Sequence, residues 1–203
     1  LTGEVGTGKT LVLECLRRAL ASRPVTFASL MHSSVTPAEF FSLCSQDFGL
    51  DCFEKPKIQI LLELHRYLIR QASEKRITCL IIDEAQNLER SVLEEIRLLG
   101  NLETPTHGKL LQVVLAGQPE FDQKLDSYGL RQLRQRIELR WRLAPFGPKE
   151  TSNYIDSRLE KAGLPDQQLI SSDVKDAIHT QSHGIPRLVN VLCDNLLLAV
   201  FSA

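Results

Sequence analysis

The sequence has no long apolar run and no excess of charge of one sign. Its longest stretch of apolar side chains is "LLLAVF" near the C-terminus, which is far shorter than the roughly 20 residues that a membrane-spanning helix needs. Lysine and arginine total 24, against 25 aspartates and glutamates, so no overall basic field draws nucleic acid or anionic lipid to the chain. We therefore expect no membrane contact in this segment, and any charged binding surface must be local.

The sequence also lacks the cysteine spacing of a zinc site or a disulfide framework. Its five cysteines include no CxxC pair and lie mostly within apolar periods, at positions 15, 44, 52, 79 and 193. Reduced thiols in a protein core fit this pattern better, so we expect a cytoplasmic location. The sequence shows no secretory signal peptide. It begins at Leu1 rather than at Met, one step before a glycine-rich loop, and we expect it to be part of a longer protein.

Helical and extended patterns alternate along the first part of the chain. Apolar residues recur at helical spacing in the segments 9–22, 36–49, 57–75 and 91–102. Buried strands are predicted at 24–30, which is rich in β-forming residues, at 77–83, which is a continuous apolar run, and at 109–117, which is a second apolar strand of that type. This alternation predicts an α/β fold in which a parallel sheet is covered by helices.

The last part of the chain has a different pattern. After an arginine-rich stretch, "LRQLRQRIELRWRLAPF", three helical segments follow at about 149–162, 172–182 and 186–201. The strongest break between the two patterns is the pair Gly147 and Pro148. We therefore predict one domain at 1–146, which contains the sheet, and a small all-helical domain at 147–203.

The loop near the N-terminus has the spacing of a phosphate-binding loop. In "GEVGTGKT", four residues separate Gly3 from Gly8, and Lys9 and Thr10 follow directly. Backbone N–H groups of such a loop surround a polyphosphate, and the helix that follows adds the partial positive charge of its N-terminus. We predict that Lys9 reaches the β- and γ-phosphates and that the Thr10 hydroxyl binds Mg²⁺. The alternative is a chance glycine turn. The predicted nucleotide-binding residues here are Gly3, Glu4, Val5, Gly6, Thr7, Gly8, Lys9, Thr10 and Leu11.

Two carboxylates follow the apolar run in "CLIIDEAQNL". Asp83 and Glu84 stand at the carboxyl end of a predicted buried strand, which is the end where ligands bind in parallel sheets. We predict that Asp83 holds Mg²⁺ through water and that Glu84 polarises the water that attacks the γ-phosphate. Solvated acids in a turn are the alternative. The letters DEAQ also occur in superfamily-two helicases, but the residues after Phe146 are too few and too helical to form the second RecA-like domain of those enzymes.

Gln118 follows the next apolar run, in "LLQVVLAGQPEF". If that strand lies between the strand of the loop and the strand of Asp83, Gln118 can touch the γ-phosphate or orient water. A simple turn residue before Pro119 is the alternative. The arginines at 131, 134, 136, 140 and 142 fit a solvated or nucleic-acid-facing stripe, but one at a subunit edge can neutralise a neighbour's transferring phosphoryl group. Arg187 begins the last helix, where it can fold back over a nucleotide.

Taken together, these segments resemble the AAA+ ATPases, and within them the bacterial family typified by the secretion ATPase ExeA, also called general secretion pathway protein A. The resemblance is carried by "GEVGTGKT", "LIIDEAQNL", "VVLAGQPEF", "LRQLRQRI" and "GIPRLVNVLCDNLLLA". It implies a P-loop domain followed by a helical lid, with Walker A at Gly3 to Thr10, Walker B at Asp83 and Glu84, sensor 1 at Gln118 and sensor 2 at Arg187. It also implies an arginine finger in "RQRI". By position before the final core strand, Arg136 is the first candidate for this finger and Arg134 the second.

The resemblance further implies an activity and a class of partner. Members of the family bind and hydrolyse ATP with Mg²⁺, and we expect this chain to do so as a homo-oligomer. Their partners are the proteins of a secretion or cell-envelope machine, and a membrane span often follows the ATPase, so the full-length protein would be anchored in the inner membrane. Similar modules serve DNA transposition and exopolysaccharide export. A DNA-binding regulator and a slow nucleotide-dependent scaffold therefore stay as alternatives, although Glu84 and the arginines speak against the scaffold.

Overall fold

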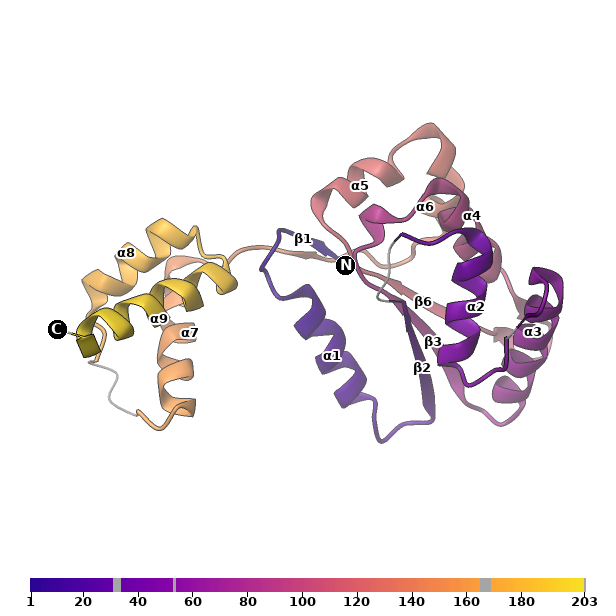
Figure 1. Ribbon diagram of the computed structural model, residues 1–203, viewed down its shortest axis with the longest axis horizontal. Helices are drawn as coiled ribbons and strands as arrows, with labels where there is room; N and C mark the ends of the chain where they lie inside the picture. The colour runs from indigo at the N-terminus through magenta and orange to yellow at the C-terminus, as the bar shows by residue number, and fades with distance from the viewer. Residues whose placement is uncertain (31–33, 53, 165–168, 203) are drawn as a thin grey trace. The chain divides into compact units, whose positions relative to one another are not determined.

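The computed structural model describes residues 1–30, 34–52, 54–164 and 169–202 (Figure 1). The chain forms two compact units. The first combines Leu1–Thr2 with Lys9–Arg142, and the second combines Gly3–Gly8 with Leu143–Ala203. The glycine-rich loop is therefore grouped with the C-terminal segment, although it is covalently continuous with Lys9.

A parallel sheet lies at the centre of the first unit. Its strands are β2 (Val25–Leu30), β3 (Ile77–Ile82) and β6 (Gln112–Leu115), in the order β2-β3-β6. Beyond β6 the chain continues the parallel pairing with an isolated bridge between Thr2 and Gly117. β6 therefore lies between β3 and the segment that leads into the loop, which is the strand order on which the prediction for Gln118 depends.

The remaining strands of the chain's described part are short. β1 (Thr2–Gly3) pairs with β7 (Arg142–Leu143), and the Thr2 N–H donates to the Trp141 carbonyl over 2.8 Å. A two-stranded antiparallel hairpin of β4 (Glu103–Thr104) and β5 (Gly108–Lys109) precedes β6. The apolar run at 109–117 gives a shorter core strand than its length suggests, because its first residue, Lys109, belongs to the hairpin and β6 spans only Gln112–Leu115.

Helices cover both faces of the sheet (Figure 1). Side chains on alternate strand positions separate the faces: Leu80 and Ile82 pack into the large core with α2, α3 and α4, whereas Cys79 and Ile81 pack with Leu13 of α1. This alternation is expected because successive side chains of a strand point to opposite faces. The helices of this unit are α1 (Lys9–Ala19), α2 (Pro37–Asp47), α3 (Lys57–Ser73), α4 (Arg90–Leu99), α5 (Pro119–Leu125) and α6 (Arg131–Arg136), with short 3₁₀ turns η1 (Ala85–Asn87) and η2 (Tyr128–Leu130). The predicted fold class, a parallel sheet covered by helices, is confirmed.

Local signals in the sequence explain several helix boundaries. Thr36 caps α2: its Oγ1 accepts from the Glu39 N–H over 3.3 Å, and a Glu39 carboxylate oxygen accepts from the Thr36 N–H over 2.7 Å. This reciprocal pair is a capping box, which satisfies two backbone donors that the first helical turn leaves without partners. Pro37 in the first turn has a fixed φ that suits the start of a helix.

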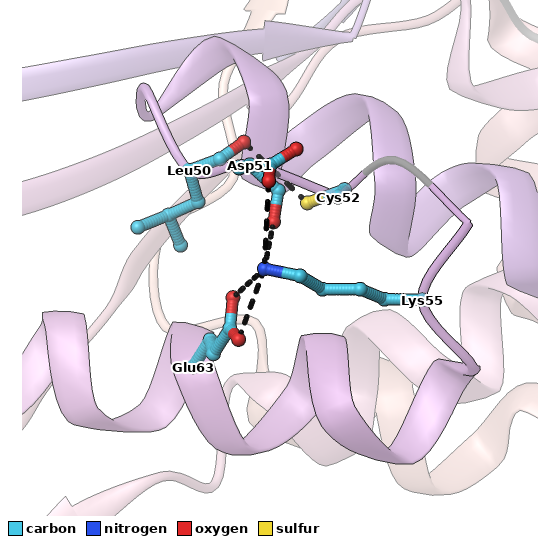
Figure 2. Close-up of polar contacts among 5 residues, drawn as sticks. All are labelled: Leu50, Asp51, Cys52, Lys55 and Glu63. Atoms are coloured by element: carbon cyan, nitrogen blue, oxygen red, sulfur yellow. Dashed lines mark hydrogen bonds and ion pairs between the residues drawn. The ribbon is translucent and has the colours of Figure 1, made fainter.

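In the connection from α2 to α3, Lys55 contacts both Asp51 and Glu63 of α3 (Figure 2). Lys55 Nζ donates to both carboxylate oxygens of Glu63, over 3.1 and 3.0 Å, and to the Asp51 carbonyl over 2.7 Å. Nearby, the Cys52 thiol donates to the Leu50 carbonyl over 3.6 Å. Because water reaches these charged groups and screens their attraction, the ion pairs add little to the stability of the fold, and the contacts mainly connect this loop to α3.

The second unit packs three helices around a small core. They are α7 (Pro148–Lys161), α8 (Ser172–Ser182) and α9 (Pro186–Ser202), and the core consists of Ile155, Leu159, Ile170, Ile178 and Val189. Gly184 makes the turn between α8 and α9 with a φ of +71, and an added Cβ there would lie 2.0 Å from the Phe146 carbonyl oxygen. Across the described ranges, no helix is both long and apolar enough to cross a membrane.

Candidate active site

The glycine-rich loop has a conformation that requires its glycines. Gly6 and Gly8 have φ values of +82 and +97, a region that side chains disfavour. At Gly3 an added Cβ would lie 2.9 Å from the Thr7 hydroxyl oxygen. Thr7 in turn closes the loop, because its N–H and its hydroxyl both donate to the Glu4 carbonyl, over 3.3 and 2.8 Å. The result is a short, tightly turned backbone.

α1 begins directly after this loop, at Lys9. The free N–H groups of a first helical turn and the helix dipole favour an anion at this point. Lys9 is the first residue of this helix, and only 6% of it is exposed. The two apolar positions predicted to line the nucleotide site, Val5 and Leu11, are 52% and 67% exposed.

Arg187 lies against the loop within the second unit. Its backbone N–H donates to the Gly6 carbonyl over 3.2 Å, and an added Cβ at Gly6 would lie 2.8 Å from the Arg187 Cβ. The first turn of α9 and the loop are therefore in close backbone contact. The sequence predicts Arg187 in the first turn of this helix, where it can fold back over a nucleotide.

Thr10 and Asp83 meet across the first unit. The Thr10 hydroxyl, in the first turn of α1, donates to Asp83 Oδ2 over 2.7 Å. Asp83 stands at the carboxyl end of β3, is 8% exposed, and accepts the Glu84 N–H at its other oxygen, Oδ1, over 2.9 Å. A hydroxyl and a carboxylate that converge in this way are hard oxygen ligands, which suit Mg²⁺.

The same donor set is too small to form a complete metal cage. In the part of the chain that the structure describes, no group of three or more His, Cys, Asp or Glu side chains could hold a metal. Mg²⁺ is usually bound through one or two carboxylates together with substrate phosphates and water. Thr10 and Asp83 therefore fit a metal ion that arrives with a phosphate ligand better than a permanently bound one.

Glu84 has an unusual backbone and a fixed side chain. Its φ and ψ are 53 and 39, in the left-handed region that is strained for a residue with a Cβ. Its Oε2 accepts from the Gln86 side-chain amide over 2.5 Å and from the Gln118 side-chain amide over 3.1 Å. These hydrogen bonds, first that of Gln86 and then that of Gln118, lower the pKa of the Glu84 carboxyl, and the charge of Lys9 acts in the same direction. Glu84 is therefore an anion at neutral pH.

The structure thus brings Glu84 and Gln118 together, as their places at the ends of neighbouring strands predict. Sequence reasoning missed Gln86. The residue types in "DEAQ" do not indicate this contact, because it depends on the 3₁₀ turn that returns Gln86 toward Glu84.

The arginines lie elsewhere on the first unit. Arg134 forms an ion pair with Asp126 over 2.7 Å, and its carbonyl accepts from Arg140 over 3.1 Å. Arg136 ends α6, is exposed, and lines a cavity of about 450 Å³ beside β6. Among the residues that the structure describes, neither Arg134 nor Arg136 is a hydrogen-bond partner of Glu84.

Comparisons with known proteins agree with this arrangement. Residues 1–125 match the family described as "AAA domain". The chain belongs to this AAA family. It is also 39% identical over 203 residues to general secretion pathway protein A of Aeromonas hydrophila, with all of this chain and 37% of that protein covered. The predicted resemblance is confirmed, and this AAA chain spans well under half the length of that relative.

Solved structures share the fold of this AAA chain. The Aeropyrum pernix ORC2 protein, solved as ADPNP-ADP complexes, has a TM-score of 0.69 at 15% identity over 95% of this chain and 53% of that one. Cdc6p of Pyrobaculum aerophilum has a TM-score of 0.68 at 17% identity, over 94% and 53%. RuvB of Thermotoga maritima, a Holliday junction branch migration motor, has a TM-score of 0.57 at 16% identity, over 100% and 55%. At these identities the likeness establishes the fold alone.

Proposed function

We propose that this chain is an ATPase that binds ATP with Mg²⁺ and hydrolyses it. The observation that carries the proposal is the contact of 2.7 Å between the Thr10 hydroxyl and Asp83, with the Glu84 carboxylate on the next residue. Membership of the AAA family and the nucleotide complexes of the ORC2 structure support the same ligand class.

Each proposed role follows from the chemistry of the residue. The loop N–H groups and Lys9 bind the phosphates, and Thr10 and Asp83 hold Mg²⁺, which supplies charge neutralisation at the phosphate oxygens when it is bound. Glu84 orients a water molecule and accepts its proton. Gln118, whose side-chain amide donates to the Glu84 carboxylate, senses the γ-phosphate.

The remaining proposed roles concern the second unit and a neighbouring subunit. We assign 147–203 as a helical lid, and Arg187 as a residue that senses the nucleotide, which is supported by its backbone contact with Gly6 of the loop. Arg136 acts in trans on the nucleotide of a second copy, with Arg134 as the alternative. Arg134 is the less suitable of the two because its guanidinium pairs with Asp126.

The proposed partners are the proteins of a secretion or cell-envelope machine, with the ATPase on the cytoplasmic side. The identity of 39% to general secretion pathway protein A supports this assignment. The second candidate is an ATP-dependent DNA-binding regulator, which is favoured by the exposed arginines around Trp141, itself 73% exposed. Binding of a DNA duplex that weakens steeply with salt would favour this second candidate, because phosphate contacts release counterions.

Dependence on Mg²⁺ tests the ATPase assignment. Steady-state ATP hydrolysis should require Mg²⁺, and Asp83→Asn should raise the half-saturating Mg²⁺ concentration by roughly tenfold or more, because one anionic ligand is lost. Asp176→Asn, an exposed position on α8, is the matched control and should leave this concentration unchanged. Absence of turnover, or turnover that is independent of Mg²⁺, would contradict the proposal.

A further inference from the structure

The Gln86 side chain joins two residues of the proposed active site. Its Nε2 donates to Glu84 Oε2 over 2.5 Å, and its Oε1 accepts the backbone N–H of Gln118 over 3.0 Å. Because the Gln118 side chain also donates to Glu84 Oε2, over 3.1 Å, the three residues form a closed ring of hydrogen bonds. This ring links the carboxyl ends of β3 and β6.

Further hydrogen bonds hold the backbone of the turn that carries Gln86. Lys124 of α5 donates from Nζ to the Gln86 carbonyl over 2.9 Å and to the Leu88 carbonyl over 2.5 Å. The Ala85 N–H donates to the Ala116 carbonyl over 2.8 Å. The 3₁₀ turn that carries Gln86 is therefore attached both to the end of β6 and to α5.

The side-chain amide of Gln86 lies close to Gly117, where a residue with a Cβ would leave no room for it. An added Cβ at Gly117 would lie 2.9 Å from Gln86 Oε1, so a larger residue at 117 would displace the amide. The glycine at this position, directly before Gln118, therefore leaves room for the Gln86 amide.

The ring determines which oxygen of Glu84 is available. Both side-chain donors, from Gln86 and Gln118, use Oε2. Within the described residues, Oε1 accepts no hydrogen bond. Since a carboxylate that is fixed at one oxygen presents the other in a defined direction, Oε1 is the atom that can accept a hydrogen bond from water.

We propose that Gln86 is a positioning residue for ATP hydrolysis: it clamps Glu84 Oε2 so that Oε1 faces the attacking water. The inference rests on the proposed ATPase function and deepens it. When the Gln118 side chain turns toward a γ-phosphate, Gln86 remains as the donor that holds Glu84, and its Oε1 still fixes the Gln118 backbone. Gln86 itself touches no reacting atom.

Two substitutions separate this role from simple packing. Gln86→Ala removes the clamp, and the turnover number should fall by roughly tenfold to a hundredfold while the affinity for ATP changes by less than about twofold, because only the reacting geometry is disturbed. Gln86→Glu keeps the size and the acceptor for the Gln118 N–H, but it presents an oxygen instead of a donor to Glu84 Oε2. It should lose as much turnover as the alanine variant. Gln59→Ala, an exposed position on α3, is the control for both and should retain the turnover of the parent.

The decisive measurement is a double-mutant cycle with Glu84→Gln. If Gln86 acts through Glu84, adding Gln86→Ala to Glu84→Gln should lower turnover by less than about twofold further, because the group being positioned has already been replaced. Losses that multiply, or parental turnover in Gln86→Glu, would overturn the proposal. Thermal unfolding shows whether each variant is folded. If Gln86→Ala does not fold, the turnover of Gln86→Glu tests the positioning role of Gln86. If Glu84→Gln alone keeps the parental rate, Glu84 is not the group that Gln86 positions and this inference fails. Absence of ATP turnover in the parent would contradict the ATPase proposal separately.

Discussion

The hydroxyl of Thr10 donates a hydrogen bond of 2.7 Å to Oδ2 of Asp83, a residue 73 positions away in the sequence. This contact joins the start of α1 to the carboxyl end of β3. It brings together the two oxygen ligands that the loop and the acidic strand end each predict, and Glu84 follows directly in the chain.

Lys9 is expected to supply binding energy for the nucleotide. Lys9→Ala should weaken ATP binding by roughly tenfold to a hundredfold, because charged hydrogen bonds to the phosphates are lost. Equilibrium binding of a fluorescent ATP analogue measures this effect. Lys149→Ala, an exposed lysine on α7, should bind like the parent. If Lys9→Ala also binds like the parent, the loop does not hold the phosphates.

The proposed role of Arg136 in trans predicts complementation between two inactive proteins. Arg136→Ala should bind ATP normally but hydrolyse it poorly, and the specific activity of the parent should rise with protein concentration. Mixing Arg136→Ala with Glu84→Gln should restore part of the activity, because some interfaces combine an intact Glu84 with an intact Arg136.

The matched control for this experiment is Arg131→Ala, at the other end of α6. It should hydrolyse ATP like the parent. Arg134→Ala should replace Arg136→Ala in the mixture if Arg134 is the finger. Activity that is independent of concentration, with no recovery from either mixture, would refute catalysis in trans.

The cysteines give a test of the packing by chemical labelling. Burial raises the pKa of Cys44 to about 12 and that of Cys79 to about 11, whereas Cys15 is exposed. A raised pKa means that less thiolate is present at pH 8, and the thiolate is the reactive form. Iodoacetamide at pH 8 should therefore label Cys15 first, and Cys44 and Cys79 only after unfolding. Early labelling of Cys44 in mass spectra would contradict the core packing.

Two phenylalanines provide a matched pair for stability. Phe40 is 0% exposed and packs edge-on to Phe41, with ring centroids 5.2 Å apart, whereas Phe201 is 91% exposed. Phe40→Ala should lower the free energy of unfolding by about 3–5 kcal/mol, because a large cavity is left in the core. Phe201→Ala should change it by less than about 0.5 kcal/mol. Denaturant unfolding measures both, and equal effects would show that Phe40 is not a core residue.

Sequence periodicity predicts the long elements well, for a physical reason. The segment 57–75 becomes α3 (Lys57–Ser73), and 77–83 becomes β3 (Ile77–Ile82). In both cases the apolar pattern itself is the surface that packs into the core. The predicted ends differ by a few residues because the last turn of a helix depends on contacts that the pattern does not encode.

Short elements and long-range contacts are less visible in the sequence. The short helices α5 and α6 follow the last core strand, but their seven and six residues are too few for helical periodicity to appear. Likewise, the ring of Glu84, Gln86 and Gln118 depends on the strand order, which places the ends of β3 and β6 side by side. Residue types can suggest the acid and the amide at the strand ends, but not that Gln86 turns back to join them.

The role of Glu84 is the central claim, and Glu84→Gln tests it most directly. The amide keeps the size of the side chain and can still accept a hydrogen bond, but it cannot take a proton from water. Equilibrium ATP binding in the presence of Mg²⁺ and steady-state hydrolysis should be measured on the same preparation. We predict that binding is retained while turnover falls by a factor on the order of 10² or more, the range for loss of a general base. Turnover within about twofold of the parent would contradict the account.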